Sequence, residues 1–165
     1  SPTYNIAGIP QADGIASWGT ARRRPDAWVR VTTEVTDLGD GIYQPAGTWQ
    51  ERFAWAWVGE KATFRLTFQN DGGAQARLRI KGAKATSKVG VVYRRGTTDV
   101  TAAVIAGTYV TPRLAPAATH VLTATMTAKS AFGVPGTKVS LLVTASTTTT
   151  PTISDGIRIA LRYNQ

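Results

Sequence analysis

The sequence predicts an all-β protein that folds as a sandwich of antiparallel strands in one domain. Apolar residues recur at every second position through most of the chain, and Gly and Pro turn signals separate these runs at short intervals. No stretch carries the apolar stripe of an amphipathic helix, and the connections are too short for the crossovers that parallel strands need. A chain of 165 residues buries an ordinary core without disulfide bonds, so one sandwich accounts for its length.

Each strand is placed by the positions where the alternation starts and stops. Phe64, Leu66 and Phe68 alternate with polar neighbours, and Ile157 and Ile159 do so near the end of the chain. Turn sequences such as N-D-G-G and P-G end the runs. The predicted strands are residues 27–35, 41–44, 49–58, 62–69, 76–81, 89–94, 99–105, 108–111, 119–127, 138–146 and 156–163.

The composition excludes several kinds of catalytic and metal site. Cys is absent, which removes thiolate ligands and Cys nucleophiles, and a single His removes any site that needs two imidazoles. That residue, His120, opens a predicted strand far from any acid in the sequence, so we predict a surface or strand-edge position for it. Asp37 and Asp40 flank a turn that lacks the full EF-hand spacing, although a metal would be sought there first. We therefore predict no catalytic residue, no metal site and no cofactor, and hence no enzyme.

Several segments resemble a known family. Residues 59–82, GEKATFRLTFQNDGGAQARLRIKG, contain a Gly turn, an amphipathic strand, N-D-G and a second strand, and the motifs D-V-T, G-T-Y, L-A-P and V-T-A-S follow in order. Over residues 26–164 they resemble the immunoglobulin-like β-sandwich modules of secreted and cell-surface bacterial and archaeal proteins. The resemblance implies that fold, a non-catalytic role as a spacer, adhesion module or structural repeat, and an extracellular or cell-surface location. Ala117 stands where the family usually has Gly, which implies a turn without a left-handed residue.

The chain divides into an N-terminal extension, residues 1–25, and the sandwich, residues 26–165. The extension begins with a strand-like pattern in which Tyr4 and Ile6 share one face, and it ends in three arginines. Three alternatives stay open: an edge strand of its own domain, a strand donated to the next subunit, or a free arm. The predicted subunit interface is Thr3, Tyr4, Asn5, Ile6, Ala7 and Ile9, and the predicted hinge is Arg22, Arg23 and Arg24, which would pair with acids of a neighbour such as Asp37 or Asp40.

Side chains alone do not hold a donated strand in place. Burying Tyr4, Ile6 and Ile9 contributes roughly 5–9 kcal/mol, whereas association costs ~4–15 kcal/mol. A ladder of backbone hydrogen bonds therefore has to contribute as well.

Tryptophans gather in one part of the sequence. Trp55 and Trp57 share a strand face with Phe53, and Trp49 precedes them. Exposed, these rings would bind carbohydrate; buried, they would fill the space between two sheets. We favour the core, because the opposite face of the same strand is also apolar, which is also a sign of an interface.

Basic residues give the chain a net charge of +9. Arg65, Arg77, Arg79 and Lys81 all alternate outward on predicted strands, which would suit an anionic polysaccharide or phosphate polymer. A solvated outer face that protects sheet edges is the favoured interpretation. Nucleic acid is disfavoured as a partner, because the sequence has no reading helix and no matching motif. No apolar run approaches the roughly 18–20 residues of a membrane span.

The function predicted from these observations is that of a non-catalytic extracellular structural protein. It would associate with copies of itself into a fibre or pilus-like polymer through donation of its N-terminal strand. A carbohydrate-binding or adhesion module that recognises surface polysaccharide is the first alternative. A coat-like protein that binds polyanions or nucleic acid is the second.

Overall fold

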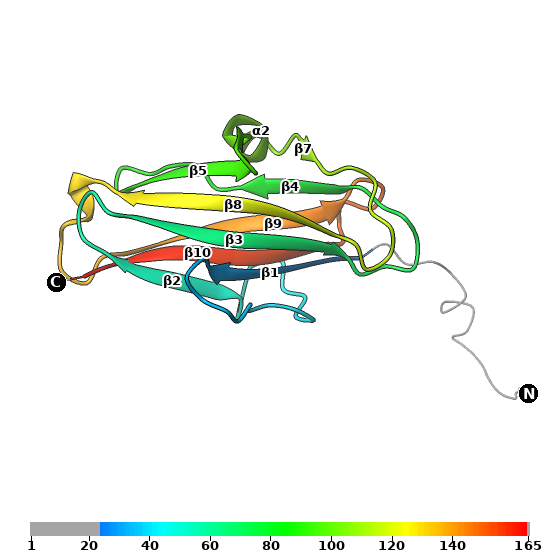
Figure 1. Ribbon diagram of the computed structural model, residues 1–165, viewed down its shortest axis with the longest axis horizontal. Helices are drawn as coiled ribbons and strands as arrows, with labels where there is room; N and C mark the ends of the chain where they lie inside the picture. The colour runs from blue at the N-terminus through cyan, green and yellow to red at the C-terminus, as the bar shows by residue number, and fades with distance from the viewer. Residues whose placement is uncertain (1–23, 165) are drawn as a thin grey trace, which may run out of the picture.

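The computed structural model describes residues 24–164, which form a β-sandwich of two five-stranded sheets (Figure 1). The first sheet has the strand order β1-β3-β8-β5-β6, and the second has the order β2-β10-β9-β4-β7. The elements are β1 (Pro25–Val31), β2 (Glu51–Ala56), β3 (Lys61–Asn70), β4 (Leu78–Gly82), β5 (Val89–Arg95), β6 (Thr98–Asp99), α2 (Thr101–Ala106), β7 (Tyr109–Val110), β8 (Thr119–Ala128), η2 (Ser130–Phe132), β9 (Lys138–Thr147) and β10 (Ser154–Tyr163).

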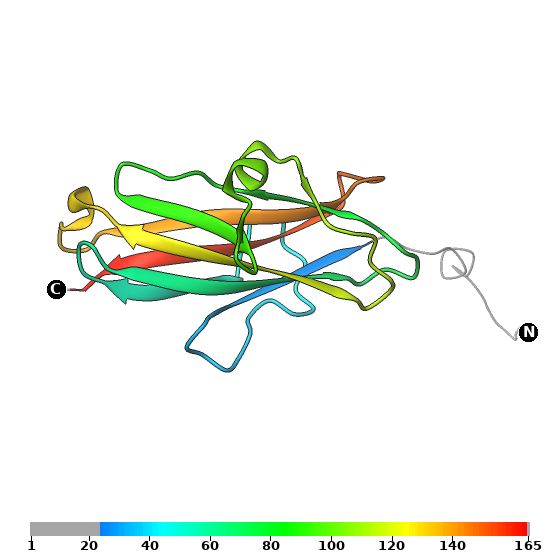
Figure 2. The same cartoon turned by 45° about the horizontal axis from the view of Figure 1, so that its top comes forward.

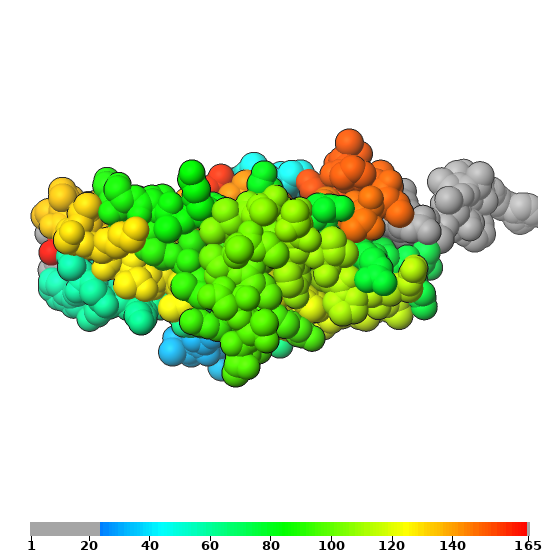
Figure 3. Space-filling model, turned by 90° about the horizontal axis from the view of Figure 1, so that it is seen from above, coloured from blue at the N-terminus to red at the C-terminus, as the bar shows by residue number. Residues whose placement is uncertain are grey.

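The strand order is that of an immunoglobulin-like sandwich. Strands β1, β3, β8 and β5 take the places of A, B, E and D in one sheet, and β4, β9 and β10 take those of C, F and G in the other. Strands β1 and β2 form the edges of the two sheets on the same side of the sandwich. Strand β7 and the helix α2 lie at the opposite side (Figures 1 and 3). The predicted all-β sandwich is confirmed.

One strand pair runs parallel, against the prediction of antiparallel pairing throughout. Strand β2 pairs in parallel with β10, from Glu51 opposite Arg158 to Ala56 opposite Tyr163. Residues 32–50 make this possible, because this long connection loops out beside the sandwich and carries the chain from the first sheet to the second (Figure 2). Residues 41–44, predicted as a strand, belong to that connection.

A short helix replaces another predicted strand. Residues 99–105 were predicted to be extended, but α2 occupies most of them and buries Val104. Alanine is the best helix former, and three alanines fall within these six residues. Gly107 ends the helix in the left-handed conformation, with a φ of 73°, and its N–H donates to the carbonyl of Val104. Among residues 24–164, no helix is long and apolar enough to cross a membrane.

The core lies between the sheets and consists of the inward-facing residues of alternating strands, as predicted for Phe64, Leu66 and Phe68. His120 belongs to this inner face, because it lies opposite Phe68 in the pairing of β3 with β8. It is buried, and a hydrogen bond of 2.7 Å joins its Nε2 to the Tyr109 hydroxyl. Burial lowers the pKa of His120 to about 4. The prediction of a surface or strand-edge histidine was wrong.

Ala117 also differs from its prediction. Its φ is 68°, so the turn does contain a left-handed residue, at a position without glycine. Two hydrogen bonds hold this residue: its N–H donates to the Asn70 carbonyl, and its own carbonyl accepts from the Gln69 side chain. These contacts offset the cost of the unfavourable backbone conformation.

Candidate binding surfaces at the edge and on the outer face of the second sheet

The outer edge of β1 is closed by other parts of the chain. The N–H groups of Ala27, Val29 and Val31 point away from β3. They donate, respectively, to Asp155 Oδ2 at 2.8 Å, to the Leu38 carbonyl at 2.9 Å and to Glu34 Oε1 at 2.9 Å. An edge strand whose donors are satisfied in this way offers little to a further strand.

Asp155 is the centre of this closure. Besides Ala27, its carboxylate accepts hydrogen bonds from the N–H groups of Gln44 and Gly156 and from the Gln50 side chain. Burial raises the pKa of Asp155, although these four donors favour its charged form. The side chain thus fastens residues 44–50 and β10 to the edge of β1.

Asp26 holds the neighbouring part of the same connection. Its Oδ2 accepts a hydrogen bond of 2.8 Å from the Gly41 N–H, while its Oδ1 has no partner within residues 24–164. Burial, with a smaller contribution from the negative charge of Asp155, raises the pKa of Asp26 to about 7. A proton therefore binds to this carboxyl far more tightly in the folded protein than in the unfolded chain.

The outer edge of β2, in contrast, is open. The Arg158 N–H donates to the Gln50 carbonyl and the Asn164 N–H donates to the Ala56 carbonyl, so the even-numbered residues of β2 turn their backbone toward β10. The backbone groups of Phe53 and Trp55 consequently point away from the sheet. Within residues 24–164, neither N–H has an acceptor. This edge is a template for another strand.

An aromatic ridge stands on the outer face along the same strand. Phe53 and Trp55 are 39% and 58% exposed, while the small residues Ala54 and Ala56 of the same strand face the core. Trp57, which is 45% exposed, follows the end of β2 and packs edge to face on Tyr163. The favoured core position of these rings was therefore wrong, because at this edge alanines fill the space between the sheets. Trp49 is 78% exposed but lies outside β2, in a turn where its φ is 66°.

The rings of the ridge do not form a flat platform. The Phe53 and Trp55 rings meet edge to face, with an interplanar angle of 87° and centroids 5.7 Å apart. The Arg162 guanidinium lies 5.2 Å and 5.3 Å from the same two centroids. Beside them is a hollow of about 460 Å³ lined by Trp55, Gly136, Thr137, Arg162, Tyr163 and Asn164. Clusters of aromatic rings and arginine are typical of the centres of protein interfaces.

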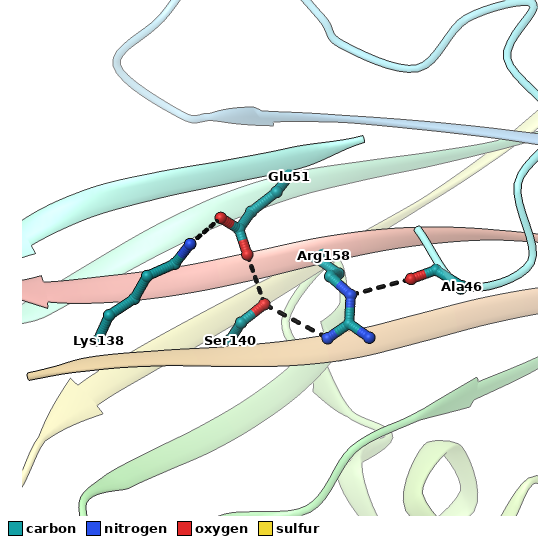
Figure 4. A network of polar contacts seen from close by, with 5 residues as sticks. All are labelled: Ala46, Glu51, Lys138, Ser140 and Arg158. Carbon is teal, nitrogen blue, oxygen red and sulfur yellow. Dashed lines mark hydrogen bonds and ion pairs between the residues drawn. The ribbon is translucent and has the colours of Figure 1, made fainter. Parts of the chain in front are cut away.

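A polar network on the outer face of the sheet links β2, β9 and β10 (Figure 4). Glu51 accepts from Lys138 and from the Ser140 hydroxyl, the latter at 2.6 Å. Although burial opposes it, these two hydrogen bonds lower the pKa of Glu51. Arg158 Nε donates to the Ala46 carbonyl at 2.9 Å, which holds residues 44–50 against the outside of β10.

The four basic residues singled out in the sequence do not lie together. Arg77, Arg79 and Lys81 are exposed on or beside β4, in the second sheet, whereas Arg65 lies on β3 in the first. On its own sheet Arg65 is directly opposite Arg30. A single surface that includes all four is therefore excluded.

The predicted strand-donating residues lie outside the described part of the chain: Thr3, Tyr4, Asn5, Ile6, Ala7 and Ile9, together with Arg22 and Arg23. Arg24 is described, and its guanidinium lies 3.4 Å above the centre of the Tyr43 ring. Asp37 lies 3.9 Å from the Arg30 guanidinium. Among residues 24–164, no group of three or more acidic or histidine side chains is arranged to hold a metal ion.

Comparisons with known proteins give distant structural likenesses. No family model and no curated protein sequence matches the chain. A FixG-related protein from Vibrio parahaemolyticus is similar with a TM-score of 0.47 and 7% identity, over 87% of this chain and 100% of that one. The secreted serine protease VesC from Vibrio cholerae has a TM-score of 0.43 and 13% identity over 68% of this chain, which spans 21% of VesC. A PapD-like domain of human CEP192 has a TM-score of 0.38 and 12% identity, over 81% and 96% of the two chains.

Proposed function

We propose that this chain is a non-catalytic structural module that associates with copies of itself by adding a strand to the open edge of β2. The donor is the N-terminal segment, residues 3–9, of another copy. The observation that supports the proposal is the pair of unpartnered N–H groups at Phe53 and Trp55, beside exposed aromatic rings. Repeated from copy to copy, head-to-tail addition of this kind gives a fibre.

Strand addition supplies what the side chains of the donor lack. Each backbone hydrogen bond contributes a net ~0.5–1.5 kcal/mol, and several form along an edge strand. The donor's Tyr4 and Ile6, which share one face of the strand, would also cover part of the ridge, which adds apolar burial on both partners. The backbone hydrogen bonds and the buried donor side chains together bring the gain into the range of the ~4–15 kcal/mol that association costs.

The length of the extension permits donation to a neighbour. Residues 10–23 separate the proposed donor strand from Arg24, and 14 residues span at most roughly 46–50 Å when fully extended. This reach also permits the segment to fold back on its own β2. The two arrangements differ in stoichiometry, since donation gives oligomers and folding back gives monomers.

The first experiment compares the full chain with a chain that lacks residues 1–20, by light scattering after gel filtration and by negative-stain electron microscopy. We expect concentration-dependent oligomers or filaments from the full chain and folded monomers from the truncated one. Monomers in both preparations, or unchanged assemblies after truncation, would refute strand donation.

A matched pair of variants tests the edge itself. Phe53→Pro removes an outward-facing N–H without removing a bond to β10, and Phe53→Ala removes the ring but keeps that N–H. We expect Phe53→Pro to abolish assembly and Phe53→Ala to weaken it. If Phe53→Pro assembles as well as the unmodified chain, the edge of β2 is not the acceptor.

An extracellular or cell-surface location belongs to the same proposal and is supported by the family resemblance. Antibody labelling of intact source cells, with and without protease treatment, tests it. Signal only after permeabilisation would contradict it.

A carbohydrate-binding or adhesion module is the second candidate. The observation in its favour is the hollow beside Trp55, where an exposed indole adjoins the guanidinium of Arg162 and the polar groups of Thr137 and Asn164. Glycan binding there would shift tryptophan fluorescence in the unmodified chain and not in Trp55→Ala. An unchanged spectrum across a panel of neutral and acidic glycans would refute this candidate.

A further inference from the structure

We infer that the row of basic residues on β4, together with the hydroxyl row beside it on β9, forms a binding site for an acidic polysaccharide. This site is distinct from the open edge of β2, since β10 lies between β9 and β2. The inference therefore does not depend on the proposed self-association.

The site is built by the register of two neighbouring strands. Arg79 lies opposite Ser146 and Lys81 lies opposite Thr144. The row continues one step further, where the Thr148 N–H donates to the carbonyl of Arg77. Alternate residues of a strand lie roughly 6.5–7 Å apart on one face. Three cations thus follow one another on β4 and just before it, with three hydroxyl groups on β9 and just after it at their side.

The three cations are available to a ligand. Arg77, Arg79 and Lys81 are exposed, and within residues 24–164 none of them forms an ion pair. Weak hydrogen bonds of 3.3 Å and 3.4 Å to the carbonyls of Thr111 and Gly107 orient the two guanidinium groups. Carbonyl groups orient a guanidinium without neutralising it, so its charge remains for an anion.

Negative charge is scarce on this sheet. Its strands carry two acids: Glu51 is paired with Lys138, and Asp155 is buried between the sheets. The field above β4 is therefore positive, and a polyanion that binds there releases its counterions.

A hollow beside the row fits a sugar ring. It has a volume of about 330 Å³ and is lined by Lys81, Gly82, Ala83, Leu142 and Thr144. Its lining is mostly apolar and includes one cation, Lys81, and one hydroxyl group, that of Thr144. Sugar rings present apolar C–H faces and polar edges, so this arrangement matches a uronate or sulfated unit.

The same surface does not suit a nucleic acid. Single-stranded nucleic acids are held by aromatic rings on which the bases stack. In residues 24–164, the exposed large apolar side chains are Val35, Trp49, Phe53, Trp55, Trp57, Val58, Val134 and Ile153. None of these belongs to β4, β7 or β9.

The test measures the affinity of the full chain for heparin and for polygalacturonate at several salt concentrations, with dextran and a single-stranded oligonucleotide as comparisons. Arg77→Gln/Arg79→Gln is set against Arg65→Gln/Arg94→Gln, which removes the same charge from the outer face of the first sheet. Arg65 and Arg94 both lie opposite Thr123, so the control pair is also a pair of neighbours.

We expect Arg77→Gln/Arg79→Gln to weaken binding of the acidic polysaccharides about tenfold or more and to reduce the salt slope by about 2. The first-sheet variant should stay within about twofold of the unmodified chain. Equal losses in both variants, no binding of either polysaccharide, or tighter binding of the oligonucleotide would each overturn the inference. Assembly, measured in the same samples, should be unchanged by Arg77→Gln/Arg79→Gln, which separates this site from the edge of β2.

Discussion

The edge strands β1 and β2, on the same side of the sandwich, differ in whether their outward-facing N–H groups have hydrogen-bond acceptors. Along β1, the N–H groups of Ala27, Val29 and Val31 all find acceptors from distant or looped-out segments. Along β2, those of Phe53 and Trp55 find none within residues 24–164. Since exposed edges invite unwanted pairing, proteins usually protect them. The protection of one edge beside an open one is the reason why β2, and not β1, is the acceptor in the proposed strand addition.

Of the changes that test this difference, we expect the loss of Asp155, whose carboxylate closes the edge of β1, to lower the stability most. Asp155→Ala leaves the buried N–H of Ala27 and the N–H of Gln44 without an acceptor, and it removes the shorter of the two hydrogen bonds that the Gln50 side chain donates. We expect it to lower the free energy of unfolding by about 3–5 kcal/mol. Urea denaturation of this variant and of Asp99→Ala, which changes an exposed carboxylate, measures the difference. A loss below about 1 kcal/mol would show that the closure contributes little.

The direction of the β2 backbone can be tested with proline at neighbouring positions. Ala54→Pro removes an N–H that faces β10, so we expect a loss on the order of 3 kcal/mol. Phe53→Pro removes one that faces away, and it should cost about 1 kcal/mol or less. Thermal unfolding of both variants compares them directly. Equal losses would mean that the outward side of β2 is already bonded.

The contribution of Asp26, which bonds to the connection formed by residues 32–50, to the stability of the protein should depend on pH. Its pKa is raised from 3.8 to about 7 in the folded protein. Because the folded protein holds this proton more tightly than the unfolded chain does, the raised pKa contributes to stability at low pH. This contribution is fully present below about pH 4 and is lost as the pH rises through about 7. Asp26→Asn keeps an oxygen acceptor for the Gly41 N–H but cannot ionise. We therefore expect the variant to be more stable than the unmodified chain at pH 8 by on the order of 1–3 kcal/mol, with little difference at pH 4. Urea denaturation at the two pH values tests this, and a difference that does not change with pH would contradict it.

The sandwich could be predicted from the sequence because alternation shows directly which residues face the core. Phe64, Leu66 and Phe68 have polar neighbours, so only one face can be buried. On β2 both faces are apolar, and alternation cannot decide between Trp55 outside and Ala56 inside. The space available between the sheets decides it, and that depends on strands far away in the sequence.

Which edge is closed and which is open could not be predicted from the sequence either. Asp155 acts on Ala27 across 128 positions, and no local pattern marks such a pair. The parallel pairing of β2 follows from the path of a long connection rather than from its composition. The split of Arg65 from Arg79 depends on which sheet each strand joins, which again is a long-range property.

Substitution of Glu34, which accepts the hydrogen bond at the end of β1, should have the smallest effect on stability, because this side chain is partly exposed. Glu34 accepts from the Val31 N–H and lies 3.4 Å from the Arg52 guanidinium, so it links the last residue of β1 to β2. Glu34→Ala loses both contacts and should destabilise the protein by about 0.5–1 kcal/mol, whereas Glu34→Gln keeps the acceptor and should lose less than about 0.5 kcal/mol. Amide hydrogen exchange at Val31 is the sensitive measurement. We expect exchange to accelerate in Glu34→Ala and to stay slow in Glu34→Gln. Similar exchange in both variants would mean that β1 is closed by Asp155 and Leu38 alone.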